Sequence, residues 1–271
     1  MRRRLGWGRF MGALFCAAAV TAAPGLARAQ APAASPPDAR AILLGMAELL
    51  AKTQRMSVSV QGGYDAVQTS GLKVEWNVIG DVTLSRPDRM RVESEQSNGA
   101  RSLTVFDGKE IFTYAEAARV YAQAPQPGGV DQTLMYFVRD LGMRLPLAAL
   151  FISRAPAELA RRVKSVEYVE TTGILGTPAH HIVGWTDTVD FQVWIAAGDQ
   201  PLPLRIVLTY RNAPGEPQFR AQLSKWNLAA DVPDSFFAFT PPADATRIPF
   251  AAAVPQMSPG SQRASAKKGA K

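Results

Sequence analysis

The 271-residue sequence contains a single cysteine, at position 16, and it lies within an apolar N-terminal stretch. The residue before it is Phe15, whereas a lipid-attachment signal has a small residue at that place. Beyond residue 29 the chain therefore has no disulfide, no thiolate metal site and no cysteine nucleophile. The stability of the folded part must come from its hydrophobic core, and the length is sufficient for one domain.

Catalytic motifs are also missing, since the sequence contains no nucleophile elbow, no His-Glu-x-x-His, no Walker loop and no Gly-x-Gly-x-x-Gly. His180 and His181 are the only histidines, and neighbours on a strand face opposite sides, so the two imidazoles are badly placed to hold one metal. Asp187 and Asp190 resemble paired glycosidase carboxylates, but acids are common in turns. We expect no metal, no cofactor and no enzymatic activity, with a hydrolase that uses His180 or His181 as the weakest alternative.

An excess of positive charge on the folded body is absent as well. Nine of the 30 basic residues lie in residues 1–29 and 251–271, which leaves 21 basic against 23 acidic residues between them. Because a nucleic-acid binder carries its basic patch on the folded body, we expect no nucleic-acid partner.

Long apolar runs are confined to the N-terminus. A basic start of Arg2, Arg3 and Arg4 precedes the apolar stretch 11–20, and small residues flank position 28, which predicts a secretory signal peptide cleaved between Ala29 and Gln30. The arginines suggest twin-arginine export, but the residues around them fit that signal poorly, so Sec and twin-arginine export both stay open. We expect a periplasmic protein without a membrane span in its mature chain; an uncleaved anchor is the alternative.

A strong two-residue alternation is present. Between Val74 and Leu84, apolar residues alternate with polar ones, and Ile79 is the one break in the pattern. The same alternation recurs over 189–195 and 204–210. Because side chains on a strand point to opposite faces in turn, this pattern predicts an antiparallel sheet with one apolar face. Such a face must be covered by helices, by a partner or by a ligand.

The remaining elements follow from helical spacing and turn residues. Ser35 as a cap, with Pro36 and Asp38, predicts a helix that starts there and ends near Gln54. Strands are predicted over 56–68, 72–85, 88–96, 101–107, 109–115, 119–124, 164–175, 178–187, 189–196, 202–211 and 217–228.

These elements predict a signal peptide (1–29), a linker (30–37), a single domain (38–250) and a disordered basic tail (251–271). The fold class is α+β, with a large antiparallel sheet curled into an open half-barrel and helices on its concave face. An apolar space between sheet and helices would suit a hydrophobic ligand.

The insertion 130–163 is the predicted cover of the apolar face. Leu134, Phe137 and Leu141 repeat at helical spacing behind Asp131, which suits an N-cap. Nearby methionines adapt to varied apolar shapes, so this helix is a candidate lid. An ordinary core helix has the same pattern.

Arginines occur next to this apolar pattern in the predicted strand 88–96. Arg89, Arg91 and Glu93 share one face of that strand, with Met90 and Val92 on the other. An ion-paired solvated face is the more common explanation. The alternative is an anionic lipid headgroup bound at the rim of the cavity.

Several stretches between about Asp38 and Phe250 together resemble a known family: Arg86–Glu93, Phe106–Lys109, Leu145–Phe151, His180–His181, Phe191–Ile195, Pro201–Arg205, Thr209–Tyr210, Pro217–Phe219 and Lys225–Leu228. The family is the predicted periplasmic proteins called domain of unknown function 2092, which is similar to the fold superfamily of the lipoprotein carriers LolA and LolB. The resemblance implies an open barrel with helices at its mouth and an apolar cavity. It implies no catalytic residues.

The leading hypothesis is a monomeric, non-enzymatic binder of a lipid, an acyl chain or a lipoprotein anchor. The alternative is an envelope module of the same fold that binds or senses a protein partner. The predicted ligand-binding residues are Trp76, Val78, Arg89, Arg91, Phe137, Leu141, Phe191, Val193, Ile206 and Leu208.

Overall fold

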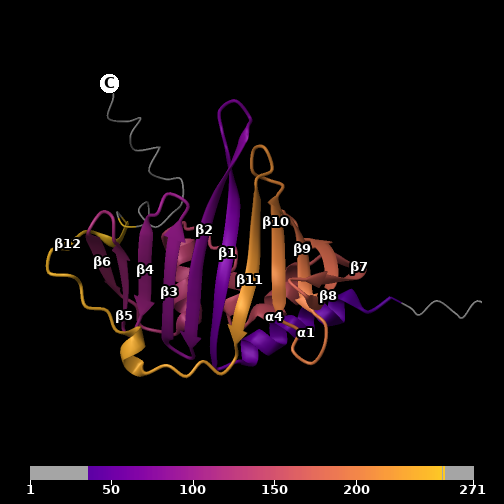
Figure 1. Ribbon diagram of the computed structural model, residues 1–271, viewed down its shortest axis with the longest axis horizontal. Coiled ribbons are helices and arrows are strands. Elements are labelled where there is room, and N and C mark those ends of the chain that lie inside the picture. The colour runs from indigo at the N-terminus through magenta and orange to yellow at the C-terminus, as the bar shows by residue number, and fades with distance from the viewer. Residues whose placement is uncertain (1–35, 252, 254–271) are drawn as a thin grey trace, which may run out of the picture. The chain divides into compact units, whose positions relative to one another are not determined.

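The computed structural model describes residues 36–251 and 253. The predicted signal peptide with its Ala29–Gln30 cleavage site and most of the predicted tail lie outside the described residues. The fold is α+β, as predicted, and is built on a large antiparallel sheet of twelve strands (Figure 1). Among the described residues, no helix has the length and apolar character needed to cross a membrane.

The twelve strands agree with the predicted ranges to within two residues at each end, except the last and shortest, which was not predicted. They are β1 (Arg55–Val67), β2 (Lys73–Ser85), β3 (Arg89–Gln96), β4 (Arg101–Phe106), β5 (Glu110–Ala115), β6 (Val120–Pro125), β7 (Ser165–Ile174), β8 (Thr177–Trp185), β9 (Val189–Ala196), β10 (Pro203–Tyr210), β11 (Gln218–Asn227) and β12 (Thr246–Arg247).

Two strand meanders meet in the middle of the sheet, where β1 pairs with β11. The strand order is β12-β6-β5-β4-β3-β2-β1-β11-β10-β9-β8-β7, and all neighbours are antiparallel except β12 and β6. Within residues 36–251 and 253 the two ends of the sheet, β12 and β7, do not pair, so the barrel stays open. β1 and β2 extend above their neighbours as a long hairpin (Figure 1).

The alternation in β2 separates the two faces of the sheet. Leu84 is fully buried and Val78 is half-buried on the face that we call the inner face, which the helices cover. Ile79 is 50% exposed on the opposite, outer face. The break in the sequence pattern is thus one apolar side chain on the outer face.

Helix α1 (Ala39–Lys52) begins one residue after Asp38, whose carboxylate accepts hydrogen bonds from the N–H groups of Arg40 and Ala41 at 2.9 and 3.0 Å. Asp38 therefore is the N-cap, in place of the predicted Ser35, which lies outside the described residues. The helix buries Leu43, Met46 and Leu50. It contacts β7 and β9, so it covers that half of the inner face.

The insertion between the two meanders is helical, as predicted, but it is broken into short pieces. They are α2 (Val130–Met135), the π-helix η1 (Tyr136–Asp140), α3 (Ala148–Phe151) and α4 (Ala155–Arg162). The π turn closes with the Leu141 N–H donating to the Tyr136 carbonyl at 3.1 Å. We call residues 130–151 the cover.

The prediction that Asp131 is the N-cap of α2 is wrong, because Gly129 occupies the N-cap position. The Asp131 carboxylate instead accepts the Ser153 hydroxyl at 2.6 Å and its N–H at 3.0 Å. It thus joins α2 to the turn before α4, a contact that spans 22 residues and that local spacing does not reveal.

Arg86 anchors the cover to the sheet. Its side chain is 8% exposed and pairs with Asp131 at 3.5 Å. It also donates to the carbonyls of Phe151 at 2.8 Å and Thr53 at 3.2 Å. Burial lowers the pKa of the Arg86 guanidinium, and the Asp131 carboxylate offsets only part of that effect.

After β11 the chain runs along one end of the sheet and packs on its outer face through the 3-10 helix η2 (Asp234–Phe237) (Figure 1). The Arg91 guanidinium lies 4.8 Å from the centre of the Phe236 ring. Beyond β12, the Phe250 ring packs against Phe137 of the cover at 6.0 Å. Ala253 is also buried, so the core extends past the predicted end at residue 250.

Candidate functional site

An apolar cavity of about 260 Å³ lies between the inner face and the cover. The sheet contributes one wall, mainly from β1 to β4 and β11, and the cover contributes the other. The large apolar residues that line it are Val60, Val78, Val82, Met90, Val92, Leu134, Phe137, Met143, Leu145, Leu147, Phe151 and Phe219.

The few polar side chains at the cavity have partners within the sheet, and Glu93 among them pairs with Arg91. Ser94 and Ser102 share a hydrogen bond of 2.8 Å between their hydroxyls. Thr104 and Thr113, cross-strand partners on the same face, lie 3.4 Å apart at their hydroxyls. An apolar cavity with satisfied polar groups holds water weakly and favours a hydrocarbon guest.

The structure brings only some of the predicted residues to this cavity. Val78 and Phe137 line it. The other predicted apolar residues belong to the inner face or the cover without reaching the cavity wall: Trp76, Leu141, Phe191, Val193, Ile206 and Leu208. Val193 and Ile206 are 3% and 7% exposed in the core, because α1 covers their half of the sheet and fills the space above them.

Arg89 and Arg91 lie on the outer face, so the prediction that they meet a headgroup at the rim of this cavity is wrong. Arg91 pairs with Glu93 at 2.6 Å and donates to the Phe236 carbonyl at 3.1 Å. Arg89 pairs with Asp88 at 3.2 Å. Met90 and Val92 occupy the inner positions of β3, and strand geometry then turns both arginines outward.

Several residues of the cover line the cavity but were not among the predicted ligand-binding residues, although Met143 was placed on the candidate lid helix. Met143, Leu145 and Leu147 come from a segment without regular helix, and no helical period marks the two leucines. The apolar run Leu145–Phe151 was the available signal, since it places Leu145 and Leu147 outside regular structure just before α3, and such residues are unusual there unless something covers them.

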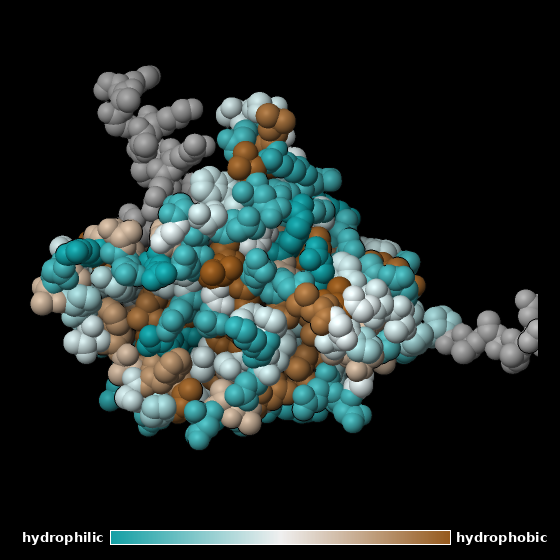
Figure 2. All heavy atoms as spheres, in the orientation of Figure 1, coloured by the Kyte–Doolittle hydropathy of each residue, from teal (hydrophilic) through white to brown (hydrophobic). Residues whose placement is uncertain are grey.

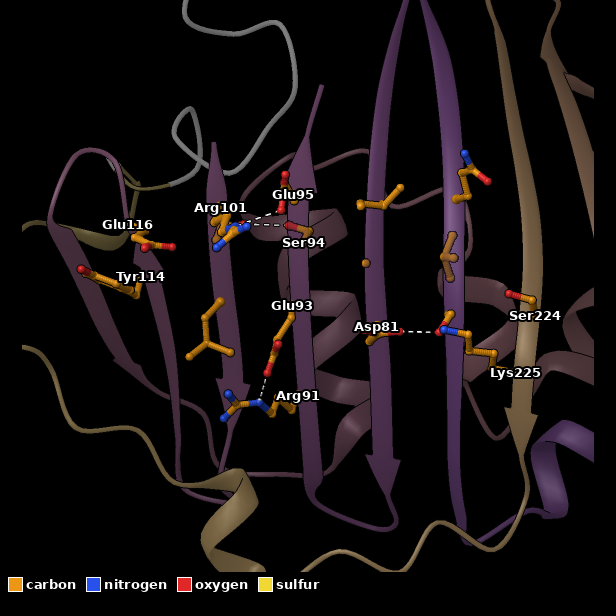
Figure 3. A pocket seen from close by; sticks show the side chains of 17 residues that line it. Asp81, Arg91, Glu93, Ser94, Glu95, Arg101, Tyr114, Glu116, Ser224 and Lys225 are labelled. Atoms are coloured by element: carbon orange, nitrogen blue, oxygen red, sulfur yellow. Dashed lines mark hydrogen bonds and ion pairs between the residues drawn. The ribbon is translucent and has the colours of Figure 1, made fainter. Parts of the chain in front are cut away.

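A second, larger hollow of about 750 Å³ lies on the outer face and is polar (Figure 3). Its charges largely neutralise one another: Arg101 pairs with Glu95 at 2.9 Å, and Arg91 pairs with Glu93. The Asp81 carboxylate accepts the Ser59 hydroxyl at 2.5 Å. Hydrophilic residues predominate across this face, with scattered apolar ones (Figure 2).

The two histidines face opposite sides of β8, as predicted. His181 stacks on Trp194 with ring centres 4.1 Å apart, and its Nε2 lies 3.2 Å from the Gln192 side chain. His180 Nδ1 lies 3.3 Å from the Tyr168 hydroxyl. No group of three His, Cys, Asp or Glu side chains in the described part of the chain could hold a metal ion.

The two turn carboxylates also act separately. Asp187 pairs with Lys164 at 3.2 Å, and Asp190 pairs with Arg211 at 3.0 Å. Each has its own cation, which is the arrangement of surface ion pairs and not of a shared acid–base site.

Comparison with known proteins supports the family seen in the sequence. The sequence model of a family described as predicted periplasmic protein (DUF2092) matches residues 39–251. Among curated proteins, none is significantly similar to this chain.

Several solved structures are similar at low sequence identity. The lipoprotein LppX of Mycobacterium tuberculosis is 15% identical with a TM-score of 0.44, over 72% of this chain and 100% of that chain. LprF of Mycobacterium bovis is 15% identical with a TM-score of 0.45, over 78% and 100%. The LolA superfamily protein NE2245 of Nitrosomonas europaea is 14% identical with a TM-score of 0.37, over 75% and 98%.

Proposed function

We propose that this protein, which belongs to the DUF2092 family of predicted periplasmic proteins, binds the hydrocarbon part of a lipid or lipoprotein anchor in its inner cavity. It acts as a carrier or binder and catalyses no reaction. The proposal includes export through a signal peptide cleaved between Ala29 and Gln30, and a monomeric state. The observation that carries it is the apolar cavity between sheet and cover.

The driving force is the removal of hydrocarbon from water. Each buried methylene contributes about 0.8 kcal/mol, so a short run of methylenes offsets the cost of immobilising the guest. An apolar cavity of about 150 Å³ is already enough for a benzene-sized guest. The cavity here, at about 260 Å³, accepts a short segment of one acyl chain without rearrangement.

A longer chain requires the cover to move away from the sheet. The segment Leu141–Leu147 has no regular helix, and the hydrogen bond from the Met143 N–H to the Phe137 carbonyl, at 2.9 Å, holds it to η1. Displacing it extends the cavity along the inner face toward Phe191, Leu208 and Trp76, which flank Phe219 and Tyr64 in the strand register. These predicted residues then join Val78 in contact with the guest.

The alternative is an envelope module that binds a protein partner, and the outer hollow favours it. That hollow is larger, polar and open, as a surface for a hydrophilic partner would be (Figure 3). Its internal ion pairs would have to be exchanged for contacts with the partner, which makes it the weaker candidate.

Substitutions at two neighbouring residues of β2 distinguish the two proposed functions. Val78 lines the inner cavity, and Ile79 lines the outer hollow. In Val78→Phe the larger ring fills the cavity, so we expect the affinity for a neutral fluorescent probe, N-phenyl-1-naphthylamine, to fall at least tenfold. Ile79→Phe is the matched control and should bind the probe like the wild type.

Native mass spectrometry of protein from the periplasm, followed by organic extraction, identifies the natural guest. A wild-type protein that neither carries a lipid nor binds the probe would contradict the proposal. If Ile79→Phe abolished capture of an envelope protein while Val78→Phe did not, the partner-binding module would replace it.

A further inference from the structure

The wall of the inner cavity contains a pair of hydroxyl groups. Ser94 of β3 and Ser102 of β4 are cross-strand partners, both line the cavity, and their hydroxyl oxygens lie 2.8 Å apart. Strand alternation places both side chains on the inner face with Val92, because Glu93 and Arg101 take outer positions of the same strands. Both serines also border the outer hollow, across the thickness of the sheet. Their hydroxyls therefore belong to the guest-binding side.

Two hydroxyls that share one hydrogen bond retain a second donor. Each serine hydroxyl carries one proton, and only one of the two protons lies between the Ser94 and Ser102 oxygens. Among the described residues, neither hydroxyl has another hydrogen-bond partner. Whichever serine accepts the shared bond is therefore able to donate its own proton to a guest.

Small neighbours leave this donor accessible from the cavity. Along the same row of the sheet, Gly80 is the partner of Ser94, and Ala115 is the partner of Ser102. Gly80 has no side chain to cover the pair, and a Cβ there would lie 2.3 Å from the Glu93 carbonyl oxygen, so larger residues do not fit. Both serines are half-buried, so a guest in the cavity is able to reach their hydroxyls.

No counter-charge accompanies the donor. Glu93 is the only ionisable residue among the described residues that line the cavity, and its carboxylate pairs with Arg91 at 2.6 Å on the outer face. A carboxylate or phosphate drawn into the cavity would lose its water without gaining a cation. An ester carbonyl loses less on leaving water and accepts the hydrogen bond that the hydroxyl pair offers. The wall therefore favours a neutral acceptor.

We propose that Ser94 and Ser102 form the subsite for the ester linkage of a neutral acyl ester, whose chain occupies the apolar part of the cavity. This inference rests on the proposed function. It deepens that function by naming the chemical class of the guest and the residues that recognise its linkage. The rest of the wall offers the chain mainly hydrocarbon, from the valines of β1 to β3 and from the cover.

The test uses three guests that differ at one group: methyl decanoate, decyl methyl ether and decanoate. The ether has a methylene in place of the ester carbonyl, so the ratio of the two affinities reports on that carbonyl. Affinities are measured at pH 8 by displacement of N-phenyl-1-naphthylamine, below the solubility limit of each guest. Comparing the ratio between variants cancels the different solubilities of ester and ether in water. We expect the wild type to bind methyl decanoate at least about tenfold more tightly than decanoate.

The double variant Ser94→Ala/Ser102→Ala should reduce the affinity for methyl decanoate about three- to tenfold relative to the ether, the loss expected for one hydrogen bond. Each single variant should reduce it less than about twofold, because the remaining hydroxyl still donates. Ser59→Ala/Ser224→Ala is the matched control, since these serines are cross-strand partners that line the outer hollow. It should change none of the affinities.

An ester-to-ether ratio that is the same in the wild type and the double variant would overturn the ester subsite and leave the proposed function standing. A wild type that binds decanoate as tightly as methyl decanoate would also overturn it, because the cavity would then hold a charged group. Failure of all three guests and of the probe to bind would refute the proposed function itself. The double variant removes two hydroxyls that bond to each other, so it leaves neither unpaired, and circular dichroism verifies its fold.

Discussion

The two faces of the sheet each carry a hollow, and the larger one is the weaker candidate for a lipid. The outer hollow of about 750 Å³ is lined by carboxylates and cations that pair with one another. The inner cavity of about 260 Å³ is lined almost wholly by hydrocarbon. Because burial of hydrocarbon supplies most of the affinity for an acyl chain, the lining decides the function and the volume does not.

The two halves of the inner face differ as well. Over β7 to β10 the face is closed by α1, a regular helix of 14 residues whose Leu43, Met46 and Leu50 fill the space. Over β1 to β4 it is closed by the cover, which changes from α-helix to π-helix to irregular chain. A regular helix presents one continuous apolar stripe, and a broken one leaves gaps. The cavity lies under the broken cover.

Arg86, which attaches the cover to the sheet, should contribute more to the free energy of unfolding than any ion pair of the outer face. Arg86→Ala removes the cation that pairs with Asp131 and the side-chain donor to the carbonyls of Phe151 and Thr53, while Asp131 keeps its hydrogen bonds from Ser153. We expect it to lower the free energy of unfolding by about 3–5 kcal/mol, measured by urea denaturation. Arg89→Ala, which breaks an exposed pair on the outer face, should cost under about 1 kcal/mol. If both variants lost the same free energy of unfolding, the buried contacts of Arg86 would be no more stabilising than an ion pair of the outer face.

The two halves of the inner face are compared by shortening one leucine in each. Leu50 of α1 is fully buried, so Leu50→Ala should cost about 3 kcal/mol through lost contacts and a new cavity. Leu145 of the cover already borders a cavity and is half-buried, so Leu145→Ala should cost only about 1–2 kcal/mol. Thermal or urea unfolding of both variants tests this, and a larger cost at Leu145 would mean that the cover is the tighter half.

Most of the sheet could be predicted from sequence because its signals are local. Alternation marks each strand, and turn residues such as Asp107–Gly108 mark the joints, so strand ends agree with the prediction to within two residues. The short strand β12 and the chain that leads to it were not predicted. They are held by contacts with distant residues, such as the Phe239 ring on Phe112 and Tyr114, which no local pattern records.

The site was only partly predictable. Periodicity assigned Val78 and Phe137 to an apolar surface, but it says nothing about which part of that surface a helix will fill. Val193 and Ile206 have the same alternation and lie under α1. The positions of Arg89 and Arg91 follow from the alternation in β3, because Met90 and Val92 on the apolar face turn both arginines away from it.

Two neighbouring residues at the end of β1, Tyr64 and Asp65, should make the stability of the fold depend on pH at opposite extremes. Tyr64 faces the inner side of the sheet and Asp65 the outer side. Burial alone raises the pKa of the outward Asp65, but hydrogen bonds from Arg220 and the Gln218 N–H, both 2.9 Å, outweigh it and hold that pKa below its usual value. A lowered carboxyl pKa stabilises the folded state above the unfolded pKa, and the contribution is lost as pH falls through the folded pKa. Asp65→Asn should cost about 1–2 kcal/mol at pH 7 and nothing in strong acid.

Tyr64, on the inner face, should make stability depend on pH in the alkaline range. Its pKa of about 12 lies above the usual value near 10, so the folded state holds the proton more tightly than the unfolded chain does. Stability should therefore fall as pH rises from about 10 to 12, and Tyr64→Phe should reduce that decline while leaving the acid response intact, because the partly buried Tyr210, whose pKa is also raised, supplies part of the rest. Urea midpoints measured from pH 3 to 12 for both variants separate the two effects. If Tyr64→Phe altered the acid limb, or Asp65→Asn the alkaline one, the two faces of β1 would be coupled and the assignment of each response to one face would fail.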